Sequence, residues 1–102
     1  MSQTLIQFKV TGDVQGVSFR YYTQKEAQKL GLKGYVYNHD DSSVQGIAVG
    51  VEDKVKQFQS YLSKGPSTAQ VHNVELIQNN SSASEEEIKK ALGGSSGFEV
   101  RR

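Results

Sequence analysis

Apolar and polar residues alternate at the start of the chain, where polar side chains separate Ile6, Phe8 and Val10. A period of two predicts a half-buried strand, which ends at Gly12. Four later segments rich in Val, Tyr, Ile or Phe predict further strands, at 32–38, 44–51, 71–77 and 98–100. The polar turn 39–43 joins the second strand to the third, so these two strands are expected to form a hairpin.

Two other segments carry apolar or small residues at every third or fourth position, which places those residues on one face of a helix. The first stripe consists of Phe19, Thr23, Ala27 and Leu30, and the second of Val55, Phe58 and Leu62. Gly31 and the Gly65-Pro66 pair follow the stripes and predict where the helices end. The order strand, helix, strand, strand, helix, strand predicts an α+β fold of the ferredoxin-like, split βαβ (βαββαβ) class. We expect an antiparallel sheet with two helices on one face, the other face partly open, and a short extra strand at the C-terminus.

With 102 residues the chain has the size of one domain, and we expect 1–102 to form a single unit. Residues 79–97 hold five Ser, three Gly and two Asn, a composition typical of a solvated surface loop. Within this stretch, Ser84 and Glu87 have the spacing of a capping box that begins a short helix. The Gly93-Gly94 pair then ends the helix, so we expect a flexible insert containing about two helical turns.

Composition excludes several kinds of chemistry. The chain has no Cys, hence no disulfide, no thiolate nucleophile and no Cys-based metal site. His39 and His72 show no metal-ligand spacing, and we expect neither a metal ion nor a cofactor. The net charge of +1 lacks the basic excess typical of nucleic-acid binders. With no long apolar run and no secretory signal pattern at the start, the sequence predicts a cytoplasmic monomer without membrane or nucleic-acid partners.

The segment from Gly12 to Arg20 joins the first strand to the first helix. A helix start exposes backbone N–H groups that lack an intrahelical partner, next to the positive end of the helix dipole. Gly12 and Gly16 permit bends in which successive N–H groups form a nest for an anion. Arg20 falls in the first helical turn, where a cation is unfavourable unless it shares an anion with those N–H groups. Its planar guanidinium matches a phosphate through bidentate hydrogen bonds.

The spacing of these residues leaves two interpretations open. The loop lacks the Lys-Ser/Thr pair of a P-loop and does not have the GxGxxG pattern. It is either an anion site or an ordinary glycine-containing connection with a surface Arg. Asn38, at the end of the second strand, is by itself typical of a turn. Asp40 and Asp41 are adjacent turn residues, so we expect solvated carboxylates that do not converge on a ligand.

Residues 10–20 read Val-Thr-Gly-Asp-Val-Gln-Gly-Val-Ser-Phe-Arg and closely resemble the signature loop of the acylphosphatase family. A second family motif begins with Gly-Tyr-Val-Tyr-Asn at 34–38 and continues through Val44 and Gly50. The resemblance covers nearly the whole chain, from residue 6 to the end. Three positions depart from the family's usual pattern: Ser42 stands where Gly is usual, Tyr37 precedes the Asn, and His39 follows it where Thr is common.

The resemblance implies metal-independent hydrolysis of the carboxyl–phosphate bond of small acyl phosphates, with inorganic phosphate as product and product inhibitor. It implies that Arg20 binds the phosphate and that Asn38 holds the attacking water. It further implies that a set of backbone N–H groups completes the phosphate site. These N–H groups belong to Gln15, Gly16, Val17, Ser18, Phe19 and Arg20. These residue types suit the chemistry, because an activated acyl phosphate needs positioned water and charge stabilisation more than a strong base.

Two other functions are compatible with the same fold. Ferredoxin-like sheets also form RNA-recognition domains, and Lys33-Gly34-Tyr35 begins like their RNP1 motif. The match fails at Val36, Asn38 and Asp40, and the chain is nearly neutral. The second alternative is a catalytically silent domain that binds other proteins. The presence of both Arg20 and Asn38 argues against it.

Overall fold

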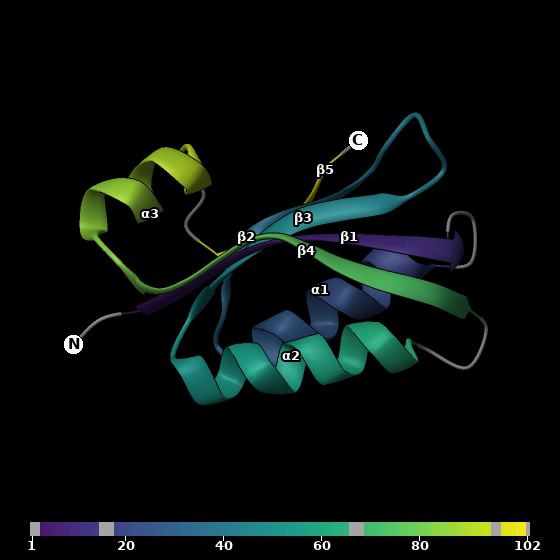
Figure 1. The fold of residues 1–102 in the computed structure, drawn as a ribbon, viewed down its shortest axis with the longest axis horizontal. Coiled ribbons are helices and arrows are strands. Elements are labelled where there is room, and N and C mark those ends of the chain that lie inside the picture. Colours follow the sequence, from purple (N-terminus) through teal and green to yellow (C-terminus); the bar gives the residue numbers. More distant parts are fainter. Residues whose placement is uncertain (1–2, 15–17, 66–68, 95–96, 102) are drawn as a thin grey trace.

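The computed structural model describes residues 3–14, 18–65, 69–94 and 97–101, which form five strands and three helices (Figure 1). The strands are β1 (Gln3–Asp13), β2 (Lys33–Asn38), β3 (Val44–Gly50), β4 (Gln70–Ala83) and β5 (Phe98–Arg101). The helices are α1 (Phe19–Lys29), α2 (Glu52–Lys64) and α3 (Glu85–Leu92). The predicted ferredoxin-like order is confirmed, and α3 and β5 follow it.

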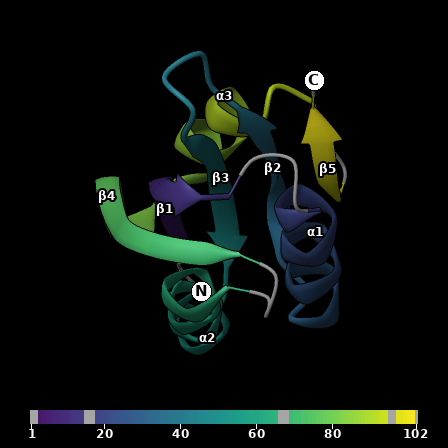
Figure 2. The same ribbon diagram turned by 90° about the vertical axis from the view of Figure 1, so that its right-hand side faces the viewer.

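The pairing of β3 with two neighbours sets the direction of the strands. β3 lies between β1 and β2 and runs antiparallel to both, so β1 and β2 point the same way. β4 pairs antiparallel with β1, and β5 pairs parallel with β2, which gives the order β4-β1-β3-β2-β5 that Figure 2 shows from edge to edge. The sheet is therefore mixed, because its short last strand runs parallel to its neighbour. The C-terminal ends of β1, β2 and β5 all lie at one end of the sheet.

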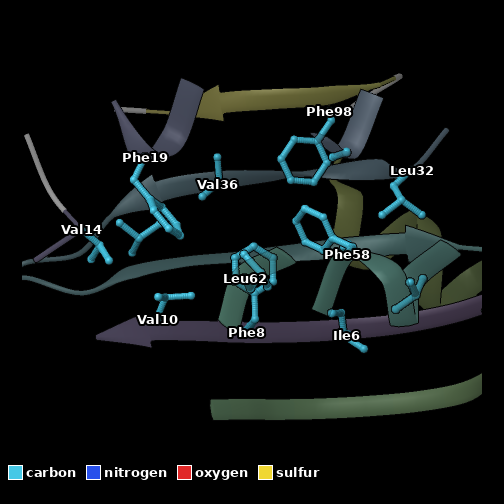
Figure 3. Close-up of a cluster of buried hydrophobic side chains, with 14 residues drawn as sticks. Ile6, Phe8, Val10, Val14, Phe19, Leu32, Val36, Phe58, Leu62 and Phe98 are labelled. Carbon is cyan, nitrogen blue, oxygen red and sulfur yellow. The ribbon is translucent and has the colours of Figure 1, made fainter. Parts of the chain in front are cut away.

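The main core lies between the sheet and the pair α1 and α2, which cover the same face (Figure 1). The alternating apolar residues of β1 are fully buried there, as their period of two predicts. Phe58 of α2 contacts Phe8 and Phe98 edge to face, with ring centroids 5.5 and 5.8 Å apart. Val14 and Phe19 lie at one end of this cluster, where β1 leads into α1 (Figure 3).

The opposite face of the sheet is partly covered by α3 (Figure 1). Leu92 of α3 packs with Leu5, Val49 and Ala83 in a second, smaller buried cluster. This cluster buries apolar side chains on the face that α1 and α2 do not reach, and it explains why β1 and β3 carry apolar residues on both faces.

The first residues of the Ser- and Asn-rich segment 79–97 belong to a strand, although their composition predicts a loop. β4 was expected to end at Ile77, but it continues to Ala83 because this part pairs with the beginning of β1. The predicted capping box of α3 is confirmed: the Ser84 hydroxyl accepts a hydrogen bond from the Glu87 N–H, and the Glu87 carboxylate accepts one from the Ser84 N–H. The flexibility of residues 79–97 stays a prediction.

The hairpin turn between β2 and β3 contains a residue in the left-handed region. Ser42 has φ 72°, and its N–H donates to the His39 carbonyl at 3.1 Å. This conformation costs a residue with a side chain roughly 1–2 kcal/mol, whereas glycine adopts it freely. This φ is the physical reason why glycine is usual at this position in the acylphosphatase family. Ser42 forms the turn with a strained backbone.

Replacing Ser42→Gly should raise the free energy of unfolding by about 0.5–1.5 kcal/mol, because it removes the left-handed strain. Chemical denaturation followed by circular dichroism measures the change. The matched control is Asp40→Gly, at an exposed turn position with an ordinary φ, which should lower stability by adding freedom to the unfolded chain. Equal changes in the two variants would contradict the assigned strain.

Candidate active site

A pocket of about 480 Å³ lies where the ends of β2 and β5 meet the start of α1. The common direction of β1, β2 and β5 produces it, because their C-terminal ends come together at one end of the sheet. A volume of this size is within the range of small-molecule sites. The lining residues are Val14, Ser18, Phe19, Arg20, Tyr21, Gln24, Asn38 and Val100.

Gly12 lets the backbone of β1 change course just before the pocket. It has φ 131°, and a Cβ atom there would lie 2.1 Å from the Gln70 carbonyl oxygen of β4. The register between β1 and β4 shifts between Thr11 and Gly12, the mark of a bulge. Any side chain at this position would collide with the neighbouring strand, so only glycine fits here.

The start of α1 lacks the compensation that helix starts usually have. Its N-cap residue, Ser18, is in the left-handed region with φ 61°, and its side chain makes no capping hydrogen bond. The first turn contains no acidic residue. This start differs from that of α3, which Ser84 and three glutamates stabilise. A helix start of this kind is suited to an external anion, which the N–H groups and the dipole both attract.

Arg20 lies in the first turn of α1, and β5 holds its side chain. The Arg20 Nη1 donates a hydrogen bond to the Arg101 carbonyl oxygen at 2.9 Å. Within the described part of the chain, no carboxylate forms an ion pair with Arg20. A neutral acceptor therefore orients the guanidinium without cancelling its charge, which can still act on an anion in the pocket.

Asn38 is the last residue of β2 and shares the inner face of that strand with the buried Val36. Its Oδ1 is buried and has no hydrogen-bond partner among the described residues. Burying such an acceptor costs about 1–3 kcal/mol, so the group calls for an explanation. Asn38 lines the pocket together with Arg20, and its Oδ1 can accept a hydrogen bond from a molecule bound there.

The structure brings the described members of the predicted site to one pocket. Gln15, Gly16 and Val17 lie outside the described residues. The Phe19 side chain is only 1 % exposed and stacks on Tyr61 with ring centroids 6.5 Å apart, so it serves the core. The predicted site residues that line the pocket are Ser18, Phe19, Arg20 and Asn38.

Sequence reasoning missed the contribution of β5 and of one further residue on α1. Gln24 lies one helical turn after Arg20, and its Nε2 donates to the Phe98 carbonyl oxygen at 3.0 Å. Arg20 and Gln24 together fasten α1 to β5. The four-residue spacing of two long polar side chains was a signal for a shared helix face. Nothing local to the sequence, however, indicated that the last strand lies beside that face.

The turn that follows Asn38 is held by Asp41. Its carboxylate accepts hydrogen bonds from the hydroxyl and the N–H of Ser43, the latter at 2.9 Å, and lies 3.0 Å from the Lys9 Nζ. The hydrogen bonds from Ser43 and Lys9 hold the pKa of Asp41 well below its ordinary value of 3.8. The hydrogen bond to Asp41 and the negative charge of that carboxylate raise the pKa of Lys9. Asp41 thus ties the β2–β3 turn to β1 close to the pocket.

The fold and the pocket together define a class of protein. It is an α+β domain with a pocket suited to a small anion, lined by a cation, an uncapped helix start and the side-chain amide at the end of a strand.

Among the described residues, none of the helices combines the length and the apolar character needed to cross a membrane.

Comparison with known proteins identifies the family. The acylphosphatase family model matches residues 6–91. An acylphosphatase from Actinobacillus succinogenes is 50% identical over 68 residues, which cover 67% of this chain and 76% of that protein. The chain belongs to the acylphosphatase family, and it is a hydrolase that acts on acyl phosphates.

Solved structures of acylphosphatases share the fold. The enzyme from Bacillus subtilis aligns with a TM-score of 0.81 and 29% identity, covering 97% of this chain and 99% of that one. The enzyme from Coxiella burnetii aligns with a TM-score of 0.79 and 32% identity, covering 98% of this chain and 94% of that one. Both alignments extend over nearly the whole chain.

The contribution of Asp41 to stability should disappear in acid. Its lowered pKa means that the stabilisation is fully present above pH 3.8 and is lost as pH falls toward the pKa of the folded state. The difference in free energy of unfolding between the wild type and Asp41→Asn should therefore be largest near pH 6 and decrease toward pH 2. Urea denaturation at several pH values measures it, with Asp40→Asn as the control. A difference that stays constant across this range would contradict the assignment.

Proposed function

We propose that the chain hydrolyses the carboxyl–phosphate bond of small acyl phosphates without a metal ion, with Arg20 binding the phosphate and Asn38 holding the attacking water. The observation that carries this proposal is the buried Asn38 Oδ1, which has no hydrogen-bond partner among the described residues and lies in the same pocket as Arg20. Family membership supports the reaction class. The proposal keeps the expectation of a cytoplasmic, monomeric enzyme that inorganic phosphate, its product, inhibits.

Phosphate recognition in this proposal rests on one cation and a set of N–H donors. Nη1 of Arg20 is already bound to the Arg101 carbonyl, and the remaining guanidinium N–H groups donate to phosphoryl oxygens. The backbone N–H groups of residues 15–20 donate to the other oxygens, aided by the dipole of α1. As the bond to the leaving group breaks, these donors stabilise the charge on the equatorial oxygens, the task that Mg²⁺ performs in other phosphoryl-transfer sites.

Asn38 positions the nucleophile. Its Oδ1 accepts a hydrogen bond from one O–H of a water molecule, which fixes the direction of the water lone pair toward phosphorus. The water oxygen forms a bond to phosphorus while the bond from phosphorus to the acyl oxygen breaks. The electron pair leaves on the carboxylate, and a water proton passes to solvent. A neutral amide is sufficient for this step, since a carboxylate is a stable leaving group and strong base catalysis is not needed.

Arg20→Ala and Asn38→Ala should each lower kcat/KM for benzoyl phosphate by about 100-fold or more, because each removes an interaction with the transition state. Steady-state consumption of benzoyl phosphate measures the loss. Arg20→Lys keeps the charge without the planar fork, and it should recover only part of the activity. Near-normal turnover in either alanine variant would refute the assigned role of that residue.

Stability separates a functional from a structural role for Asn38. Because its Oδ1 has no hydrogen-bond partner to lose in the described part of the chain, Asn38→Ala should leave the free energy of unfolding unchanged or slightly higher. Thermal unfolding by circular dichroism provides the measurement alongside the activity assay. A variant that loses activity together with more than about 2 kcal/mol of stability would instead indicate a structural residue.

Chelation and product inhibition test the remaining parts of the proposal. EDTA should leave turnover unchanged, and inorganic phosphate should inhibit competitively against the acyl phosphate. A loss of activity in EDTA that a divalent cation restores would overturn the metal-independent mechanism. Inhibition that excess substrate does not relieve would place phosphate outside the Arg20 site.

A further inference from the structure

The pocket that contains Arg20 and Asn38 has an apolar side that is open to solvent. Five large hydrophobic side chains are exposed among the described residues, and two of them, Tyr21 and Val100, line this pocket. Their exposed fractions are 51 % and 37 %, whereas Val14 and Phe19 in the same lining are about 1 % exposed. Exposed apolar groups gathered at a pocket are a feature of ligand-binding sites, because a ligand can bury them.

Two different elements bring these side chains together. Tyr21 follows Arg20 on α1, and Val100 lies on the same face of β5 as the buried Phe98, since alternate residues of a strand point the same way. The hydrogen bond from Gln24 to the Phe98 carbonyl joins α1 to β5 beside them. Tyr21 and Val100 therefore hold fixed positions next to the cation of the site.

The Tyr21 ring is also restrained by its neighbours on α1. It meets the Tyr22 ring edge to face, with centroids 5.3 Å apart and planes at 72°. The Lys25 Nζ lies 5.4 Å from the Tyr21 ring centroid, within the range of a cation–π contact. A ring that is ordered before binding loses little conformational entropy when a ligand packs on it.

We propose that Tyr21 and Val100 form the wall that contacts the acyl group of the substrate, so that the enzyme favours acyl phosphates with an aromatic or extended aliphatic acyl group. This inference rests on the proposed function, because it takes the phosphate to lie at Arg20. One bridging oxygen joins phosphorus to the acyl carbon, which keeps the acyl group in the pocket when the phosphate is bound. Contact with the two side chains removes apolar surface from water, and an acetyl group is too small to gain much from it.

The experiment compares benzoyl phosphate with acetyl phosphate in the same set of variants. Tyr21→Ala should lower kcat/KM for benzoyl phosphate about tenfold, mainly through KM, and change it less than about twofold for acetyl phosphate. Val100→Ala should shift the ratio of the two kcat/KM values in the same direction by a smaller factor. Taking the ratio cancels the different intrinsic reactivities of the two substrates and any small loss of folded protein.

Ile77→Ala is the control, because Ile77 is another large hydrophobic residue that is 50 % exposed, and it is not part of the pocket lining. It should change the ratio less than about twofold, and the inhibition constant of inorganic phosphate should be the same in all three variants. A ratio unchanged in both Tyr21→Ala and Val100→Ala, or shifted equally by Ile77→Ala, would overturn the proposal. Failure of the proposed function has a different signature, in which Arg20→Ala retains turnover of both substrates.

Discussion

The antiparallel pairing of β3 with both β1 and β2 is the constraint on which the site depends. It forces β1 and β2 to point the same way, so the C-terminal ends of both strands lie at one end of the sheet. β5 adds a third strand end there, because it runs parallel to β2. Arg20 and Asn38 lie on different elements, and they line one pocket only because of this arrangement.

Features that do not favour stability gather around this end of the molecule. Arg20 lies at the positive end of a helix dipole, and Ser18 and Ser42 adopt left-handed backbone conformations. The Asn38 Oδ1 is buried with no hydrogen-bond partner among the residues that the structure describes. Other parts of the described structure follow the usual rules more closely, as the buried aromatic core under the sheet and the fully capped α3 illustrate. Departures of this kind are expected where a protein keeps groups ready for a ligand rather than for its own packing.

Elements whose apolar residues follow a clear period could be predicted from the sequence. The stripe from Phe19 to Ala27 is the buried face of α1, and Gly31 lies just beyond its end as a left-handed glycine. The length of β4 could not be predicted, because its Ser- and Asn-rich second half has little intrinsic preference for a strand. It is a strand through pairing with the start of β1, a contact between segments that lie far apart in the chain.

The sequence by itself determined the residue types, their local spacing and the family: a glycine-containing strand-to-helix loop with Arg20, and Asn38 at the end of a strand. Only the tertiary structure decided that these groups share a pocket, that the Arg101 carbonyl orients Arg20, and that Tyr21 and Val100 line its open side. The physical reason is that local spacing encodes backbone preferences and the buried face of each element. Contacts between distant residues depend instead on strand order and direction, which the whole core determines.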